Sequence, residues 1–239
     1  MALRKVGKAI RCVCDRIYRP ALINHLVAAA IEHENALRPL TCKTVIDIGA
    51  NRGQFALVAR RCFPLARIIS FEPLATPAKE FGAIFRNDPE VVLHQAAVGP
   101  VRERRTMHIA GRDDSSSLLP LTPTQNRLFP GTAEVGTVST DVAPLQDFLQ
   151  SREIPAPAML KIDVQGFELQ VLRGCESLLE RFAYVYAECS FIELYKGQAL
   201  ADEVIAWLRE RRFRLTGIYN MVNDVSGKAI QADFFFVSN

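Results

Sequence analysis

The chain has 239 residues, enough for one domain with a sizeable core or for one domain and an extension. Its 49% apolar and 23% charged residues are typical of a globular protein. A net charge of +3, with no basic stripe that carries interleaved aromatic residues, argues against a nucleic-acid partner. The six cysteines are scattered and form no C-x-x-C pair, which favours a cytoplasmic location.

Residues 1–40 predict a helical N-terminal extension, followed by a domain over residues 41–239. The extension has the pattern of one or two helices, broken at Pro20 and ending near Pro39. The first helix is basic and amphipathic, so it could lie on an anionic membrane, or it could pack on the core and leave its cations in solvent. We favour packing on the core and keep peripheral contact with a membrane as the alternative.

The stretch from Thr44 to Pro73 carries the first chemical motif. It is T-V-I-D-I-G-A-N-R-G-Q-F, then a helical pattern, then R-I-I-S-F-E-P. This order of strand, glycine turn, helix, strand and acid predicts a βαβ nucleotide-binding unit. Gly49 and Gly53 let the backbone turn sharply and approach a ligand. Glu72 follows Gly53 by 19 residues, and a carboxylate at this place can accept both hydroxyls of a ribose.

The acid that precedes the turn, Asp47, distinguishes between two classes of cofactor. A dinucleotide places its pyrophosphate against the N-terminus of the helix, where a carboxylate would repel it. S-adenosylmethionine carries no phosphate, and its amino group and sulfonium are cationic. The turn therefore favours S-adenosylmethionine over NAD. An NAD-dependent oxidoreductase is the alternative, although the chain lacks G-x-G-x-x-G and an evident Tyr-x-x-x-Lys pair.

The middle of the chain continues the alternation of helices and strands. The patterns predict, in order, a helix over 75–86, a third strand over 91–99, a strand over 101–110, a strand over 135–140 and a helix over 141–150. Ala97 is small enough for a flat adenine to lie against the third strand. Residues 111–132 are irregular and polar, which indicates either a segment over the acceptor pocket or a mobile surface loop.

A second chemical motif is M-L-K-I-D-V-Q-G-F-E-L-Q-V-L-R-G, residues 159–174. A buried strand ends in Asp163, and ligands of open α/β sheets bind beyond such strand ends. A carboxylate there can orient an acceptor hydroxyl and take its proton, or bind a metal. The next strand, 182–191, carries Glu188 near its end. A helix over 200–211 and a closing hairpin, with the final strand inserted antiparallel, complete the chain.

Four segments in this order resemble the FkbM family of S-adenosylmethionine-dependent O-methyltransferases. They are V-I-D-I-G-A-N-R-G-Q-F, S-F-E-P, H-Q-A-A-V-G and L-K-I-D-V-Q-G-F-E-L-Q-V-L-R-G, and the resemblance covers about residues 43–237. It implies an α/β, class I methyltransferase fold, with a Rossmann-like seven-stranded sheet of order 3-2-1-4-5-7-6 flanked by helices. It also implies methyl transfer from S-adenosylmethionine to a hydroxyl of a sugar, glycolipid or polyketide-type acceptor.

The resemblance carries over to individual positions. It implies that the cofactor-binding residues are Asp47, Gly49, Asn51, Gly53 and Glu72, with Ala97 against the adenine. The implied catalytic residue is Asp163, supported by Lys161 and Glu188.

Two alternatives stay open beside this assignment. Gln165 stands where family members commonly carry glutamate, so a metal cluster is not indicated, although a divalent metal is kept as an alternative. A non-catalytic domain of the same fold, binding a partner or a membrane through residues 1–38, is the other alternative.

Overall fold

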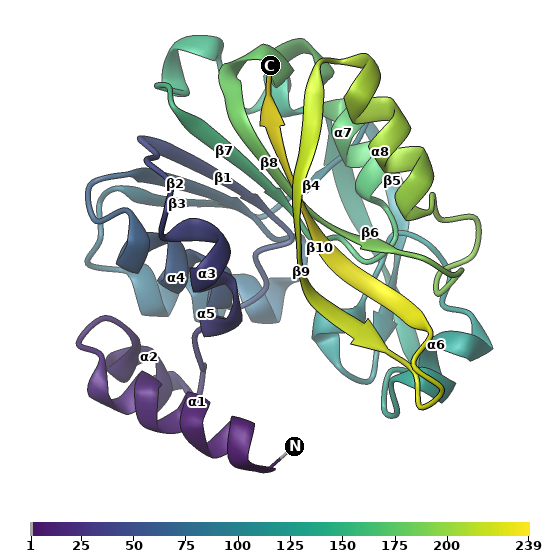
Figure 1. Cartoon of the computed structure of the whole chain (residues 1–239), viewed down its shortest axis with the longest axis horizontal. Coiled ribbons are helices and arrows are strands. Elements are labelled where there is room, and N and C mark those ends of the chain that lie inside the picture. Colours follow the sequence, from purple (N-terminus) through teal and green to yellow (C-terminus); the bar gives the residue numbers. More distant parts are fainter. Residues whose placement is uncertain (1) are drawn as a thin grey trace.

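The computed structural model describes residues 2–239, with side chains from Gly7 onward, and its centre is a seven-stranded sheet (Figure 1). Strand β10 (Ala229–Ser238) is antiparallel to both of its neighbours, and the remaining pairs in this sheet are parallel. Counted along the chain within the sheet, the strand order is 3-2-1-4-5-7-6, as the resemblance implies. From one edge to the other the strands are β3 (Val91–His94), β2 (Arg67–Phe71), β1 (Thr44–Ile48), β7 (Ala158–Ile162), β8 (Phe182–Ser190), β10 (Ala229–Ser238) and β9 (Phe213–Asn223).

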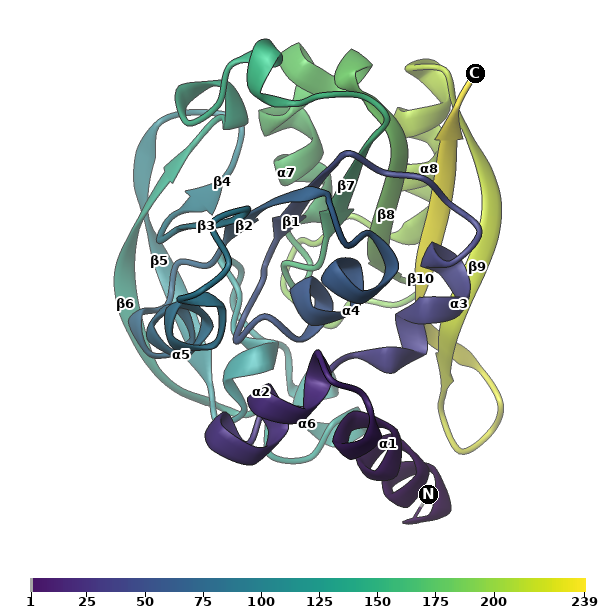
Figure 2. The ribbon, with the colours of Figure 1, turned by 90° about the vertical axis from the view of Figure 1, so that its left-hand side faces the viewer.

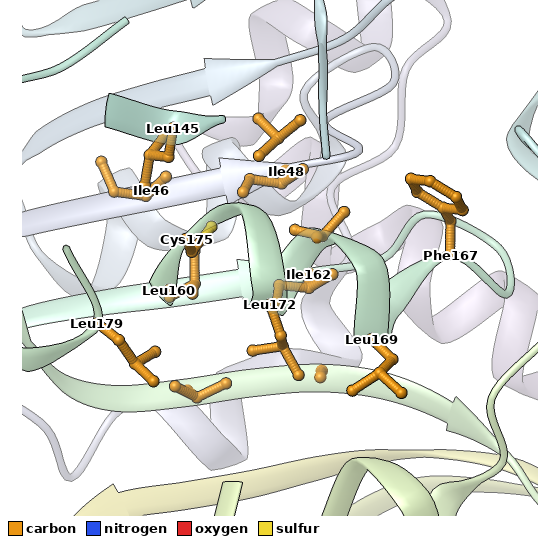
Figure 3. Packing of buried hydrophobic residues seen from close by; sticks show 14 of the residues in the cluster. Ile46, Ile48, Leu145, Leu160, Ile162, Phe167, Leu169, Leu172, Cys175 and Leu179 are labelled. Carbon is orange, nitrogen blue, oxygen red and sulfur yellow. The ribbon is translucent and has the colours of Figure 1, made fainter. Parts of the chain in front are cut away.

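Helices cover both faces of the sheet (Figure 1). Those on one face are α3 (Glu34–Leu37), α4 (Gln54–Cys62) and α5 (Ala75–Phe85), and those on the other are α7 (Glu168–Gly174) and α8 (Ala201–Glu210). Successive strand residues point to opposite faces. Val45 therefore packs with the α4 side, whereas Ile46 and Ile48 pack with Leu172 of α7 in the cluster of Figure 3.

A separate three-stranded sheet corrects the prediction of one continuous strand over 91–99. Strand β3 ends at His94, and the chain enters the second sheet at β4 (Ala97–Val98). There β4 pairs with β6 (Glu134–Ala143), which also pairs with β5 (Glu103–Ala110). The long sequence separation of β4 from β6 explains why this pairing left no local signal.

The predicted helix over 141–150 is wrong at its start. Val142 pairs with both Ala97 and Glu103, so β6 continues to Ala143, and only a 3₁₀ turn follows Pro144. Residues 111–132 are not a structureless loop, because Ser117 and Gln125 are buried there. The shorter helical segments of the chain are η2 (Asp113–Ser115), α6 (Pro123–Leu128), η3 (Leu145–Asp147), η4 (Ser151–Glu153) and η5 (Glu176–Arg181).

The N-terminal extension comprises α1 (Ala2–Cys14), α2 (Tyr18–His25), η1 (Ile31–His33) and α3, and α1 lies at the lower left of Figure 1. The predicted break at Pro20 is wrong, because the helix breaks at Asp15, whose side chain accepts a hydrogen bond from the Ile17 amide. Pro20 instead lies in the first turn of α2, where a missing N–H leaves no helical bond unmade.

The extension packs against the α4 face of the sheet. Tyr18 is fully buried, and its hydroxyl donates to Glu34, which also contacts Arg11 and Arg38. Residues 18–37 share one apolar cluster with β1, α4 and Phe235 of β10. Helices α1 and α2 lie at the bottom of Figure 2, and several of residues 25–33 of the extension line the same cavity as Gly49 and Asp163, which follow β1 and β7.

Candidate active site

A cavity of about 810 Å³ lies at the carboxyl ends of β1, β7 and β8, on the face that the extension covers. Ligand pockets in proteins have volumes of about 300–1,000 Å³, so this cavity is of ligand size. One wall comes from residues 48–52, 54–55, 71–74 and 96–98. The opposite wall comes from residues 25–33 of the extension and from the final hairpin.

The two glycines of the first turn have different roles. Both have left-handed backbones, with φ of +84° at Gly49 and +89° at Gly53, where glycine is favoured. A Cβ on Gly49 would overlap the carbonyl oxygen of Asp163, so glycine allows β1 and β7 to approach. A Cβ on Gly53 would lie 2.6 Å from the Phe85 ring. Gly49 lines the cavity, whereas Gly53 lies behind the wall and permits packing of α4 on α5.

Every amide of the glycine turn is already hydrogen-bonded within the protein. The N–H groups of Gly49 and Ala50 donate to the Phe71 carbonyl, and Gly53 N–H donates to the Ala50 carbonyl. Asn51 N–H donates to Glu72 at 2.9 Å, and Arg52 N–H donates to the Asn51 side chain at 2.9 Å. The amides of residues 49–53 therefore offer no spare donor to a pyrophosphate.

Glu72 joins the end of β2 to the glycine turn and lies on the cavity wall. One carboxylate oxygen accepts from Asn51 N–H and the other from Leu74 N–H at 2.8 Å. Burial raises the pKa of Glu72 to about 7, and these two amide bonds oppose the rise. Each carboxylate oxygen has two lone pairs, so each can accept a second hydrogen bond from a ligand hydroxyl.

Asn51 and Ala97 also lie on the cavity wall, as the resemblance implies. Asn51 adopts a left-handed backbone with φ of +45°, and its side-chain oxygen accepts from Arg52 N–H, which closes the turn. Ala97 is buried in β4 and presents only a methyl group beside Ala96. This part of the wall is flat enough for a planar ring to lie against it.

Asp47 lies beneath the cavity wall and does not line it. It stands opposite Lys161 in the β1–β7 register, and its Oδ1 is 3.2 Å from Lys161 Nζ. Neither Asp47 oxygen makes a hydrogen bond with the part of the chain that the structure describes, so the ion pair is its main compensation. Burial alone would lower the pKa of Lys161, but Asp47 and Asp163 raise it above its usual value. The charge of Asp47 therefore reaches the cavity only through Lys161.

A chain of polar side chains follows β7 and β8 along the cavity wall. The Gln165 amide donates to Asp163 at 2.8 Å and to Glu188 at 3.0 Å, and its oxygen accepts from the Tyr195 hydroxyl. Lys161 Nζ lies 3.7 Å from the other Asp163 oxygen. Burial and then the charge of Asp163 raise the pKa of Glu188 well above its usual value. The amide of Gln165 thus separates two carboxylates that a glutamate at this position would repel.

Three polar residues that meet on the cavity wall are among those with no counterpart in the sequence-based site. They are His33 of η1, Asn220 of β9 and Asp233 of β10. Asp233 did leave a signal, because it interrupts the apolar run A-D-F-F-F of the final strand. His33 left none, because its place depends on how the extension folds over the sheet.

The described residues show no group of three or more His, Cys, Asp or Glu side chains that could hold a metal ion. Arg52, Arg112 and Lys161 on the cavity wall each lie within ion-pair distance of a carboxylate. By contrast, neither Glu72 nor Glu188 has a cationic partner at that distance within residues 7–239. These two carboxyl groups therefore have no cationic partner on the described part of the wall, and the pKa of each is raised.

The sheet order and the cavity at the carboxyl strand ends define a Rossmann-like α/β protein of the class I methyltransferase type. Among solved structures, an uncharacterised protein of Listeria monocytogenes is similar to the chain with a TM-score of 0.50 and 8% identity. That similarity covers 87% of this chain and 67% of the other and reflects the fold alone.

The chain belongs to the FkbM methyltransferase family, whose domain model matches residues 47–215. It is 26% identical over 142 residues to the hexuronic acid methyltransferase AglP of Haloferax volcanii, covering 59% of this chain and 54% of that one. It is 25% identical over 160 residues to the 2-O-methyltransferase NoeI of Sinorhizobium fredii, covering 64% of this chain and 66% of that one. The chain therefore spans about half to two thirds of these relatives' own length.

Proposed function

We propose that the protein is an S-adenosylmethionine-dependent O-methyltransferase that acts on a hydroxyl of a sugar, glycolipid or polyketide-type acceptor. The observation that carries this proposal is the glycine turn, whose amides are all used internally while the carboxylate of Glu72 stands beside it. An anionic dinucleotide fits such a turn poorly, and a cationic nucleoside without phosphate fits it well. The name of AglP, a hexuronic acid methyltransferase, supports a sugar-type acceptor, and that of NoeI, a 2-O-methyltransferase, supports transfer to oxygen.

In this proposal, different residues of the cavity wall contact different parts of the cofactor and the acceptor. Glu72 accepts the ribose hydroxyls, and Ala97 supports the adenine. Bound S-adenosylmethionine supplies a methyl group on a sulfonium. Asp163 accepts a hydrogen bond from the acceptor hydroxyl and holds its oxygen in line with that methyl group, because alignment is the main contribution a protein makes to such a displacement. Lys161 and Glu188 hold Asp163 and its neighbour Gln165 in place.

Calorimetry with two ligands tests the cofactor class. We expect S-adenosylhomocysteine to bind the purified protein and NADH not to bind under the same conditions. Binding of NADH in place of S-adenosylhomocysteine would favour an oxidoreductase and overturn the proposal. Binding of neither would favour the non-catalytic alternative.

Mass spectrometry then identifies the acceptor. Extracts of cells that lack the protein are incubated with the purified protein and S-adenosylmethionine, and glycolipids, sugars and secondary metabolites are compared. The expected result is a new species heavier by one CH₂. A methylated amine would contradict O-methylation, and a methyl ester in place of an ether would contradict a hydroxyl acceptor, while both outcomes would keep methyl transfer.

Asp163→Asn is expected to leave the affinity for S-adenosylhomocysteine within about threefold and to reduce the methylation rate by about 10–100-fold. The amide keeps the size of the side chain but cannot accept from the hydroxyl with a full charge, which weakens orientation of the acceptor. The rate is measured with tritiated S-adenosylmethionine and the extract that the wild-type protein methylates. An unchanged rate would assign Asp163 a structural role only.

Peripheral contact with a membrane is proposed for the N-terminal helices. Ile10 is 59% and Val13 is 45% exposed on α1, one turn apart, and Arg16 and Arg19 are exposed nearby. Apolar side chains flanked by cations are typical of helices that lie on anionic lipid. None of the helices in residues 2–239 is long and apolar enough to pass through a bilayer.

Vesicle flotation tests this contact. We expect the protein to float with phosphatidylglycerol vesicles and to remain unbound with phosphatidylcholine vesicles, because the cations are attracted by anionic lipid. The double variant Ile10→Glu/Val13→Glu should lose binding, whereas Val225→Glu, in the exposed turn of the final hairpin, should keep it. Equal flotation of all three proteins would contradict the contact.

A further inference from the structure

A line of polar side chains crosses four neighbouring strands of the sheet, and three of them, Lys161, Glu188 and Asp233, line the cavity. Lys161 stands opposite Asp47 on one side and Tyr186 on the other, and Glu188 stands opposite Asp233. All of them point to the face that the extension covers, because they share the alternation of their strands. Buried positions of a sheet usually carry apolar side chains. This continuous line of polar side chains is therefore a specific feature of the site.

His33 is the extension residue that closes over this line. Its Nδ1 lies 3.0 Å from the Tyr186 hydroxyl, 3.2 Å from Asn220 Nδ2 and 3.4 Å from Asp233 Oδ2. The Asn220 amide also donates to Asp233 at 2.7 Å, so the carboxylate is held in place. The imidazole packs edge-on against Phe55, with ring centres 5.4 Å apart, and its side chain is only 14% exposed. One ring nitrogen is thus fixed by three strands.

The other ring nitrogen, Nε2, makes no hydrogen bond within the described part of the chain, and His33 lines the cavity. With the ring proton on Nδ1, directed towards the Tyr186 hydroxyl and Asp233, and with the Asn220 amide donating to Asp233, Nε2 carries a free lone pair; this is the arrangement of a general base and its orienting acid. Burial lowers the pKa of His33, and Asp233 opposes that effect. A neutral imidazole at neutral pH can accept a proton.

We propose that His33 is the general base of the methyl transfer and that Asp233 is its positioning residue. This inference rests on the proposed function. As the bond forms between the acceptor oxygen and the methyl carbon, the carbon–sulfur bond breaks and its electron pair stays on sulfur. The proton of the hydroxyl passes to His33 Nε2 and then to solvent, so charge and atoms balance.

Asp163 is less suited to this proton transfer than His33. One of its oxygens accepts from Gln165, and the other faces the ammonium group of Lys161. Both oxygens therefore already have a partner within the protein. Asp163 therefore orients the hydroxyl, while an imidazole, whose ordinary pKa lies close to neutral pH, is better matched to take the proton.

Neither His33 nor Asp233 belongs to the segment that the family model matches. His33 precedes residue 47 and Asp233 follows residue 215, so both lie outside the matched region. The base and its partner thus come from the two ends of the chain, while the matched region supplies the cofactor wall. The charged and titratable groups that face His33 are Asp233, Tyr186, Lys161, Asp163 and Glu32.

Substitution of His33 tests the proposal on two readouts. His33→Gln is expected to bind S-adenosylhomocysteine within about threefold of the wild-type affinity. Its methylation rate, measured with tritiated S-adenosylmethionine and the extract that the wild-type protein methylates, should fall by about 10²-fold or more, the range of general-base catalysis. His108→Gln, outside the cavity wall, is the matched control and should keep the wild-type rate.

Chemical rescue separates a base from a structural residue. Added imidazole should restore part of the rate to His33→Ala and should not affect His108→Ala. The wild-type rate should rise with pH through the pKa of His33, and that dependence should disappear in the His33 variants. Loss of rate without rescue, or a rate within threefold of wild type, would overturn the proposal.

Nuclear magnetic resonance tests the pairing without any acceptor. The imidazole pKa of His33, followed in the whole chain by titration, should fall in Asp233→Asn, because the amide removes a carboxylate that stabilises the protonated ring. An unchanged pKa would overturn the role of Asp233. If the wild-type protein binds no S-adenosylhomocysteine, the proposed function fails, and this titration still decides whether the two residues are coupled.

Discussion

Lys161→Met is expected to lower the free energy of unfolding by about 3–5 kcal/mol, the cost of leaving one partner of a buried ion pair alone. Asp47 is fully buried, and Lys161 is its main compensation. Methionine fills a similar volume, so the loss comes from charge rather than from a cavity. The measurement is urea unfolding followed by circular dichroism, with the exposed Lys79→Met as the matched control.

The pH dependence of that loss has a definite sign. Without Lys161, the folded-state pKa of Asp47 rises further above its unfolded value, because burial already raises it. A raised carboxyl pKa makes folding less favourable as pH increases through the window between the unfolded and folded values. Lys161→Met should therefore be more destabilised at pH 7 than at pH 5. Asp47→Asn/Lys161→Met should recover part of the stability, and equal stability of all variants would contradict the buried pair.

Glu72→Ala is expected to weaken binding of S-adenosylhomocysteine by tenfold or more, which is about 1.4 kcal/mol or more. The change removes the acceptor for the ribose hydroxyls and also frees the amides of Asn51 and Leu74 that shape the turn. Calorimetry measures the affinity, and thermal unfolding of the same samples verifies that the variant is folded. Glu90→Ala, an exposed acid at the start of β3, is the control.

The affinity of the wild-type protein should also depend on pH. Only the ionised carboxylate of Glu72 accepts from both hydroxyls, and its pKa is raised by burial to about 7. Binding should therefore strengthen as pH rises from 6 to 8, and Glu72→Gln should remove that trend. A flat profile in the wild-type protein would place Glu72 outside the binding contacts.

The βαβ unit could be predicted because each of its signals is local. The strand before Gly49, the helix after Gly53 and the acid at Glu72 each follow from a short pattern, and β1, α4 and β2 lie where the pattern places them. The strand order followed from family resemblance, not from any residue pattern. The second sheet could not be predicted, because β4 finds its partner β6 far along the chain.

Position on the cavity wall was easiest to predict near strand ends. Glu72 and Asp163 directly follow their strands, Glu188 lies near the end of β8, and all three line the cavity. Asp47 does not, because its neighbour across the sheet is Lys161, and register between distant strands is not visible in a sequence. His33 could not be found either, because the path of the extension is set by packing rather than by local pattern.

The two walls of the cavity have different origins in the chain. The wall beside the glycine turn is built from one compact run, 48–98, whereas the facing wall is assembled from residues 25–33 and the last hairpin, whose side chains meet across 187 positions at His33 and Asn220. Substitutions in the two terminal segments can thus reshape what enters the cavity while the opposite wall keeps its form. Exchange of these segments between related chains is accordingly a direct route to new substrate preferences in the laboratory and in evolution.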